Sequence, residues 1–148
     1  MQFQTYSSHL QCAHRWHLLA LYAVLYNPYR FDTDNPNETV KSVLDAIPRS
    51  GAYSNYEVPF RTFYNEHMSE VTGDSYIYFI GDARNNKNAS GEDYVKAIAR
   101  KAKKAFWLNT EEVDKWNHGD SIMGVYAKYM TRVAQTVTPA ELLGFLEM

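Results

Sequence analysis

The sequence contains a single cysteine, Cys12, so no disulfide bond can form within the chain. It has no recognisable secretory signal, and its longest apolar run, residues 18–26, is far shorter than the roughly 20 residues that span a bilayer. These absences predict a cytoplasmic protein without a membrane span. The phosphate-binding pattern Gly-x-x-x-x-Gly-Lys-Ser/Thr is also missing, so the chain is not expected to hydrolyse ATP itself.

An excess of charge of one sign is lacking as well. The 15 Lys and Arg residues nearly balance the 17 Asp and Glu residues, which leaves a formal net charge of −2. This balance gives no general attraction to nucleic acid, which is therefore not expected as a partner. Aromatic residues are plentiful, with 12 tyrosines and 3 tryptophans, and the 45% of hydrophobic residues is enough for a packed domain in a chain of 148 residues.

Strand-like and helix-like segments alternate along most of the chain. The clearest strand is predicted at residues 75–81, which are apolar on both faces, and two more at 104–108 and 132–137. Helices are predicted at residues 36–47, 55–71, 91–103 and 121–130, and after the capping signature Thr138-Pro139-Ala140-Glu141. The alternation predicts an α/β fold, a doubly wound and mostly parallel sheet between two layers of helices.

The first 31 residues follow a different pattern. Residues 14–26 are apolar on nearly every side, which predicts a buried helix, and at most a short extended piece is expected at 29–31. We therefore expect a divergent N-terminal helical segment, 1–31, and an α/β region, 32–148, whose sheet is incomplete on its N-terminal side.

Three segments at the expected carboxyl ends of strands resemble a known family. They are Gly81-Asp82-Ala83-Arg84-Asn85-Asn86, Trp107-Leu108-Asn109, and Trp116 followed by Gly119-Asp120-Ser121-Ile122-Met123 and Tyr126. In order and spacing they resemble von Willebrand factor A-type (VWA) domains of the CoxE-like kind. Ser54-Asn55-Tyr56 is a looser fourth match. The resemblance covers residues 32–148 and implies the three-layer α/β fold of that family.

The resemblance also bears on metal binding. Many VWA domains hold Mg²⁺ through an Asp-x-Ser-x-Ser loop, a Thr or Ser of a second loop and an Asp of a third. By resemblance, Ser54 and Asp82 stand at the second and third positions. The Asp-x-Ser-x-Ser loop is missing, and residues 1–31 contain no aspartate. We therefore expect no resident cofactor and at most weak Mg²⁺ binding.

The function that the resemblance implies is protein binding rather than catalysis. CoxE-like proteins act with MoxR-type AAA+ ATPases, so the expected role is that of an adaptor between such an ATPase and its client. The expected binding rim, or remnant of a metal site, consists of Ser54, Asp82, Arg84, Asn85, Asp120 and Ser121. The alternative is a degenerate or truncated family member without independent activity.

Simpler roles compete with these assignments. Asp82 also fits a turn aspartate bonded to nearby amides, Ser54 a helix N-cap, and Asp120-Ser121 the cap of a helix that begins at residue 122. The rings of Trp107 and Tyr126 suit a core position better than a contact surface.

A hydrolase is a further alternative. The only cluster of soft metal ligands is His9, Cys12, His14 and His17, and on one helix these would spread over nearly half of the circumference. Gly73-Asp74-Ser75 and Gly119-Asp120-Ser121 echo the nucleophile motif of serine hydrolases, but neither follows a clear strand.

The edge of the predicted sheet suggests one more property. Without a strand from residues 1–31, the strand at 75–81 would expose backbone amides and carbonyls to another chain. Self-association is therefore expected.

Overall fold

The computed structural model of the chain describes residues 55–147 and, before them, residues 17–18, 21–22, 24–25, 29–30, 37–38 and 41. The chain divides into two compact units. One comprises residues 1–20 and 26–49, and the other comprises residues 21–25 and 50–148.

A three-stranded parallel sheet lies at the centre of the second unit. Its strands are β5 (Tyr76–Ile80), β6 (Lys104–Asn109) and β7 (Arg132–Gln135), in the order β5-β6-β7. Tyr78 pairs in register with Phe106. The three predicted strands and their parallel pairing are confirmed, as expected for strands that are joined through helices.

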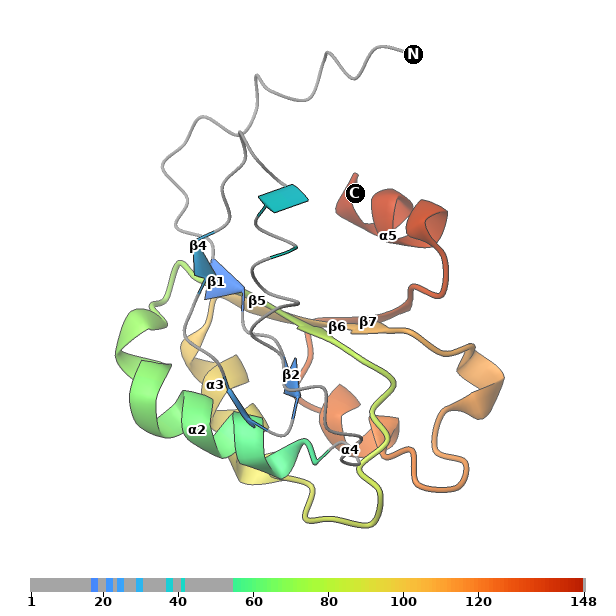
Figure 1. Cartoon of the computed structure of the whole chain (residues 1–148), viewed down its shortest axis with the longest axis horizontal. Coiled ribbons are helices and arrows are strands. Elements are labelled where there is room, and N and C mark those ends of the chain that lie inside the picture. Colours follow the sequence, from blue (N-terminus) through green and yellow to red (C-terminus); the bar gives the residue numbers. More distant parts are fainter. Residues whose placement is uncertain are drawn as a thin grey trace. The chain divides into compact units, whose positions relative to one another are not determined.

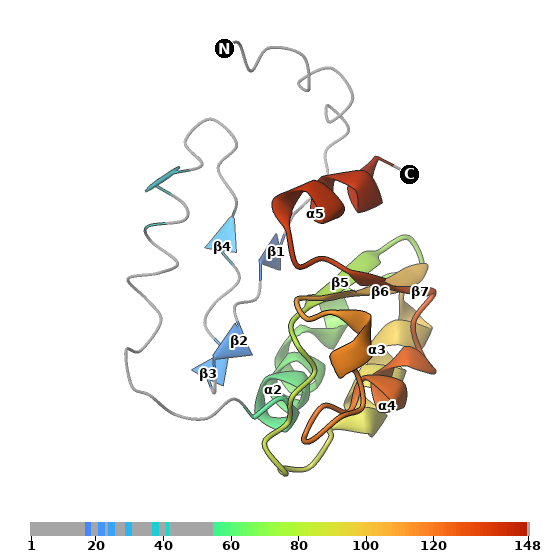
Figure 2. The same ribbon diagram turned by 90° about the vertical axis from the view of Figure 1, so that its right-hand side faces the viewer.

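Helices cover both faces of this sheet (Figure 1; Figure 2). On one face lie α2 (Glu57–His67), α3 (Glu92–Lys101) and α4 (Met123–Ala127), and on the other lies α5 (Pro139–Leu146). α3 joins β5 to β6, and α4 joins β6 to β7. Because each strand is added on the same side of the one before it, right-handed crossovers place both connecting helices on one face. The structure thus has the predicted α/β doubly wound arrangement. No helix in the described part of the chain has the length and apolar character needed to cross a membrane.

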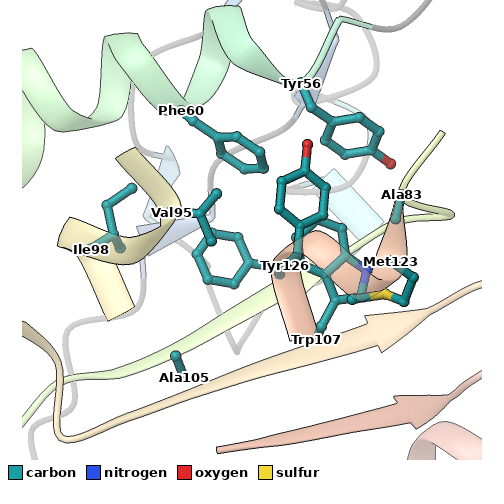
Figure 3. Close-up of a cluster of buried hydrophobic side chains, with 10 residues drawn as sticks. Tyr56, Phe60, Ala83, Val95, Ile98, Ala105, Trp107, Met123 and Tyr126 are labelled. Carbon is teal, nitrogen blue, oxygen red and sulfur yellow. The ribbon is translucent and has the colours of Figure 1, made fainter. Parts of the chain in front are cut away.

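Stacked aromatic rings form the core between the sheet and the first helical layer (Figure 3). Trp107 of β6 is fully buried and stacks on Tyr126 of α4, with ring centroids 4.6 Å apart. Phe79 stacks on the same indole at 5.4 Å, and Phe60 of α2 packs edge-on against Tyr126 at 5.7 Å. Such ring pairs contribute about 0.5–1.5 kcal/mol each beyond the area they bury. Trp107 and Tyr126 are therefore core residues.

The helix α5 starts at the predicted capping signature. The Thr138 side chain accepts a hydrogen bond from the Glu141 amide (3.2 Å), and the Glu141 carboxylate accepts one from the Thr138 amide (2.8 Å). This completes a capping box, with Pro139 in the first turn. The N-cap residue of α3 is Gly91, in the left-handed region, and the Ser90 hydroxyl before it accepts a hydrogen bond from the Glu92 amide at 3.2 Å.

The helix predicted at residues 121–130 is shorter than expected, and α4 has only five residues. Its N-cap residue is Ile122, which makes no side-chain capping bond, so the predicted Asp120-Ser121 cap is wrong. The Ser121 hydroxyl instead accepts a hydrogen bond from the Asn117 amide at 3.3 Å, and the Asn117 side chain accepts one from the Gly124 amide at 2.5 Å. Asn117, in the left-handed region with φ 63°, thus stabilises the helix start.

The helix predicted at residues 14–26 is wrong where the structure describes that stretch. Short antiparallel pairs occur instead, β1 (His17–Leu18) with β4 (Tyr29–Arg30) and β2 (Leu21–Tyr22) with β3 (Val24–Leu25). A run that is apolar on nearly every side has no amphipathic period, so periodicity cannot separate a helix from short strands. The extended piece expected at 29–31 coincides with β4, and residues 37, 38 and 41 are helical, as predicted for 36–47.

Candidate functional site

The loop after β5 meets the segment before α4 at the carboxyl edge of the sheet. Arg84 and Ser121 form an isolated antiparallel bridge between these two segments. Beside it, the Ile122 amide donates a hydrogen bond to the Ala83 carbonyl at 2.9 Å. Backbone pairing therefore fixes the relative position of two of the segments that carry the family resemblance.

The Arg84 guanidinium ties a third loop to this edge. Its Nε donates to Glu111 Oε1 at 2.9 Å, and its Nη1 donates to Asp120 Oδ1 at 2.7 Å and to the His118 carbonyl at 3.4 Å. Glu111 belongs to the loop after β6, so one side chain connects the loops after two neighbouring strands with the segment before α4. The three ion-pairing side chains are about a quarter exposed, 28% for Arg84, 23% for Glu111 and 25% for Asp120.

The charges in this cluster favour the ionised forms. The hydrogen bond from Arg84 is the main cause that lowers the pKa of the Asp120 carboxyl below its ordinary value. The bonds from Glu111 and Asp120 in turn raise the pKa of the Arg84 guanidinium. The Arg84 guanidinium and the Asp120 carboxylate therefore each favour the charged form of the other.

Glu111 is held in place from the end of β6. Its amide donates to the Asn109 side-chain oxygen at 2.8 Å, and Asn109 is completely buried. The Glu111 atom Oε2 is also buried and accepts no hydrogen bond from the described residues. A buried acceptor without a donor costs roughly 1–3 kcal/mol, which the rest of the fold offsets.

Asp82 shapes the loop after β5 and links it to α2. Its Oδ1 accepts hydrogen bonds from the Arg84 amide at 3.0 Å, a turn of the Asx type, and from the Tyr56 hydroxyl at 2.9 Å. Tyr56 precedes α2 and is only 7% exposed. Burial first, and then the charge of Asp82, raise the pKa of the Tyr56 phenol, so it stays protonated and donates to the carboxylate.

The same loop contains an unusual amount of backbone strain. Ala83 (φ 58°), Asn86 (φ 51°) and Lys87 (φ 61°) all lie in the left-handed region, and Ala83 is fully buried. For a residue with a Cβ atom this conformation costs about 1–2 kcal/mol. Strained backbone of this kind concentrates at functional sites, where the surrounding structure holds it in place.

Five of the six predicted rim residues come together at this edge, namely Asp82, Arg84, Asn85, Asp120 and Ser121. Asn85 and Ser121 are buried, and Asn85 donates a side-chain hydrogen bond to the Asn88 carbonyl at 2.6 Å. The sixth, Ser54, lies outside the described residues, as do the side chains of the N-terminal His and Cys cluster.

Sequence analysis missed Glu111 and did not assign a role to Tyr56. Glu111 comes two residues after the end of β6, which corresponds to the position of Asp82 after β5. Its place beyond a strand end could have marked it, because the carboxyl ends of parallel strands share one edge. The bond from Tyr56 to Asp82 joins residues 26 apart in sequence, and no local pattern announces it.

The described residues do not fit a tight magnesium site. Mg²⁺ needs several oxygen ligands around one point. One Asp82 oxygen already accepts two hydrogen bonds, while Glu111 and Asp120 are paired with a guanidinium that would repel a cation. Within residues 55–147 no three His, Cys, Asp or Glu side chains are arranged to hold a metal ion.

Comparisons of the chain with models of protein families, with curated proteins and with solved structures found no match.

Proposed function

We propose that the chain is a VWA-like protein-interaction module of the CoxE-like kind, which binds its partner at the carboxyl edge of the sheet. The observation that carries this proposal is the Arg84 guanidinium, which joins the loop after β5 to Glu111 and to Asp120. The loop after β5, the loop after β6 and the segment before α4 therefore lie together at one edge of the sheet. In α/β sheets the carboxyl edge is where ligands bind.

Strain and burial support a binding role for this edge. The left-handed Ala83 and the buried acceptor of Glu111 both cost stability, and costs of this kind concentrate at functional sites. In the proposed complex, Asn85 and Ser121 hold the loops, since both are buried. The partner contacts the quarter-exposed Arg84 and Asp120.

The resemblance to CoxE-like proteins suggests which kind of partner binds at this edge. We propose that the module connects a MoxR-type AAA+ ATPase with its client, and that ATP hydrolysis belongs to the ATPase. No catalytic role is assigned to a residue of this chain, and no step through a metal ion is proposed.

Binding to a MoxR-type AAA+ ATPase from the same organism tests the proposal, measured by biolayer interferometry and by the ATP hydrolysis rate. Arg84→Lys and Asp120→Asn should each weaken binding by about tenfold, which corresponds to 1.4 kcal/mol. Arg61→Ala, which breaks an ion pair on α2 away from the rim, is the matched control and should bind like wild type. Equal binding by all of these variants would refute the assignment of the rim.

One observation favours a second candidate, a degenerate family member without independent activity. The polar groups of the rim bond mostly to one another, with Asp82 held by Tyr56 and with Arg84 paired to two carboxylates. The same assay separates the candidates, because a degenerate member would fold cooperatively and bind none of the ATPases tested.

A further inference from the structure

The strand β5 forms an edge of the described sheet, where it pairs only with β6. The Gly81 amide donates to the Leu108 carbonyl, and the Ser75 carbonyl accepts from the Lys104 amide. The backbone groups of Ser75, Ile77, Phe79 and Gly81 are therefore the ones that point toward β6, because alternate residues of a strand bond to opposite sides. It follows that the amides and carbonyls of Tyr76, Tyr78 and Ile80 point away from the sheet.

The same three residues carry the side chains on the outer face of β5. Tyr76 is 47% exposed and Ile80 is 53% exposed, while the Tyr78 ring stacks on Phe106 with centroids 5.1 Å apart. Edge strands are ordinarily protected by a charge, a proline or a bulge. The segment Tyr-Ile-Tyr-Phe-Ile has no charge and no proline, and among the described strands only β6 pairs with it, so its outer side is a template for another strand.

We propose that β5 pairs antiparallel with β5 of a second copy of this chain, about a two-fold axis at Tyr78. In this register Tyr78 lies opposite its counterpart and Tyr76 lies opposite Ile80. All three residues direct their backbone groups outward, so each opposed pair exchanges both of its backbone hydrogen bonds. Their side chains share one face, where Tyr–Tyr and Tyr–Ile cross-strand pairs stabilise the contact.

The charges at the two ends of the sheet favour this antiparallel arrangement. At the amino end the cations are Arg100, Lys101, Lys103 and Lys104, and at the carboxyl end the carboxylates are Asp82, Glu111, Glu112, Asp114 and Asp120. The Lys103 ammonium lies 5.6 Å from the Tyr76 ring, beside the edge itself. Antiparallel pairing sets the basic end of one copy along the acidic end of the other, whereas parallel pairing would oppose like charges. Each end also holds some of the opposite charge, Asp74 in the turn before β5 at the amino end and Arg84, Lys87 and Lys115 at the carboxyl end. The cations still outnumber the carboxylates at the amino end, and the carboxylates outnumber the cations at the carboxyl end.

The expected dimer is weak. A stable interface buries about 1,200–2,000 Å² in total. One pair of five-residue strands with flanking side chains provides less than that, so association depends on protein concentration. Because part of the attraction comes from exposed charges, added salt should weaken it further.

Sedimentation velocity of the full chain over a wide range of concentrations measures the dimer. Ile80→Glu and Tyr76→Lys should each weaken self-association by about tenfold, equivalent to 1.4 kcal/mol. Mixing these two variants should restore association, because the register opposes residue 80 of one copy to residue 76 of the other and so pairs a carboxylate with an ammonium. Leu143→Lys on α5 is the matched control, because Leu143 is 59% exposed and apolar but lies away from the edge, and it should associate like wild type.

Several results would overturn the proposal. One is a monomer at every concentration. Another is equal disruption by Leu143→Lys, which would move the interface to α5, and a third is failure of the mixed variants to associate. Hydrogen exchange gives an independent check, since strong protection of the Tyr76, Tyr78 and Ile80 amides in a dilute monomer would mean that the chain itself covers this edge.

Discussion

Replacing Arg84 by alanine removes the side chain that joins the three loops of the candidate site. Arg84 makes charged hydrogen bonds to Glu111 at 2.9 Å and to Asp120 at 2.7 Å, and all three side chains are about a quarter exposed. Hydrogen bonds to charged groups contribute about 1.5–3 kcal/mol when buried, and exposed ion pairs contribute about 0–1 kcal/mol. At intermediate exposure we expect about 1 kcal/mol for each bond.

The free energy of unfolding of Arg84→Ala should therefore fall by about 2 kcal/mol, which corresponds to a Tm lower by roughly 4–8 °C for a chain of this size. Urea titration followed by circular dichroism measures the change. Arg61→Ala is the control, because Arg61 is bonded to Glu57 at the same 2.9 Å but is 48% exposed. Its loss should stay below about 0.5 kcal/mol.

At acidic pH, part of the difference in unfolding free energy between wild type and Arg84→Ala should disappear. Because Arg84 lowers the pKa of Asp120, the Asp120 carboxylate adds stability above its unfolded pKa of about 3.9 and loses it as the pH falls through the lower folded pKa. The difference in unfolding free energy between wild type and Arg84→Ala should be largest at neutral pH and should become smaller at acidic pH. Two results would refute the importance of this cluster. One is a loss of unfolding free energy in Arg84→Ala no larger than that in Arg61→Ala, and the other is a difference between Arg84→Ala and wild type that does not change with pH.

Three further outcomes are expected. Tyr126→Phe should cost about 1 kcal/mol in urea titration, because the buried hydroxyl donates to the Ser90 carbonyl at 2.7 Å, and the cost should not vary between pH 6 and 9 since burial raises the pKa of this phenol. Thr138→Ala should also cost about 1 kcal/mol by removing the capping box with Glu141, and Thr138→Ser should restore most of it. Calorimetric titration with Mg²⁺ should show no binding tighter than about millimolar, and a micromolar site would contradict the ligand set described above.

Much of the fold could be predicted from local sequence. The apolar segments at 75–81, 104–108 and 132–137 each contain a strand, because a strand covered on both faces is recognisable from its composition. Thr138 and Glu141 mark the start of α5, since a capping box is complete within four residues. The parallel pairing of the strands could also be predicted, because strands and helices alternate along the chain and strands joined through helices lie parallel.

The candidate site could be predicted only in part. Asp82 and Asp120 were expected at one edge of the sheet. This expectation follows once the strands are known, because the carboxyl ends of parallel strands share one edge. The partner of Arg84 did not follow, because Glu111 is 27 residues away and only the packing of the loops brings the two side chains together. Asp120 likewise pairs across the rim instead of capping α4.

Where local signals are weak or conflicting, tertiary structure decides. Residues 18–26 are apolar throughout and therefore fit a helix and a strand equally well, and the described pairs within them are strands. Asn117, which no sequence signal marked, stabilises the start of α4 because its loop returns to that helix. Within residues 55–147 the sequence by itself determined where the strands and most of the helices lie, since periodicity and caps act within one turn or one strand. Only the tertiary structure decided which side chains meet across the carboxyl edge, because such contacts depend on strand order and loop conformation over long separations.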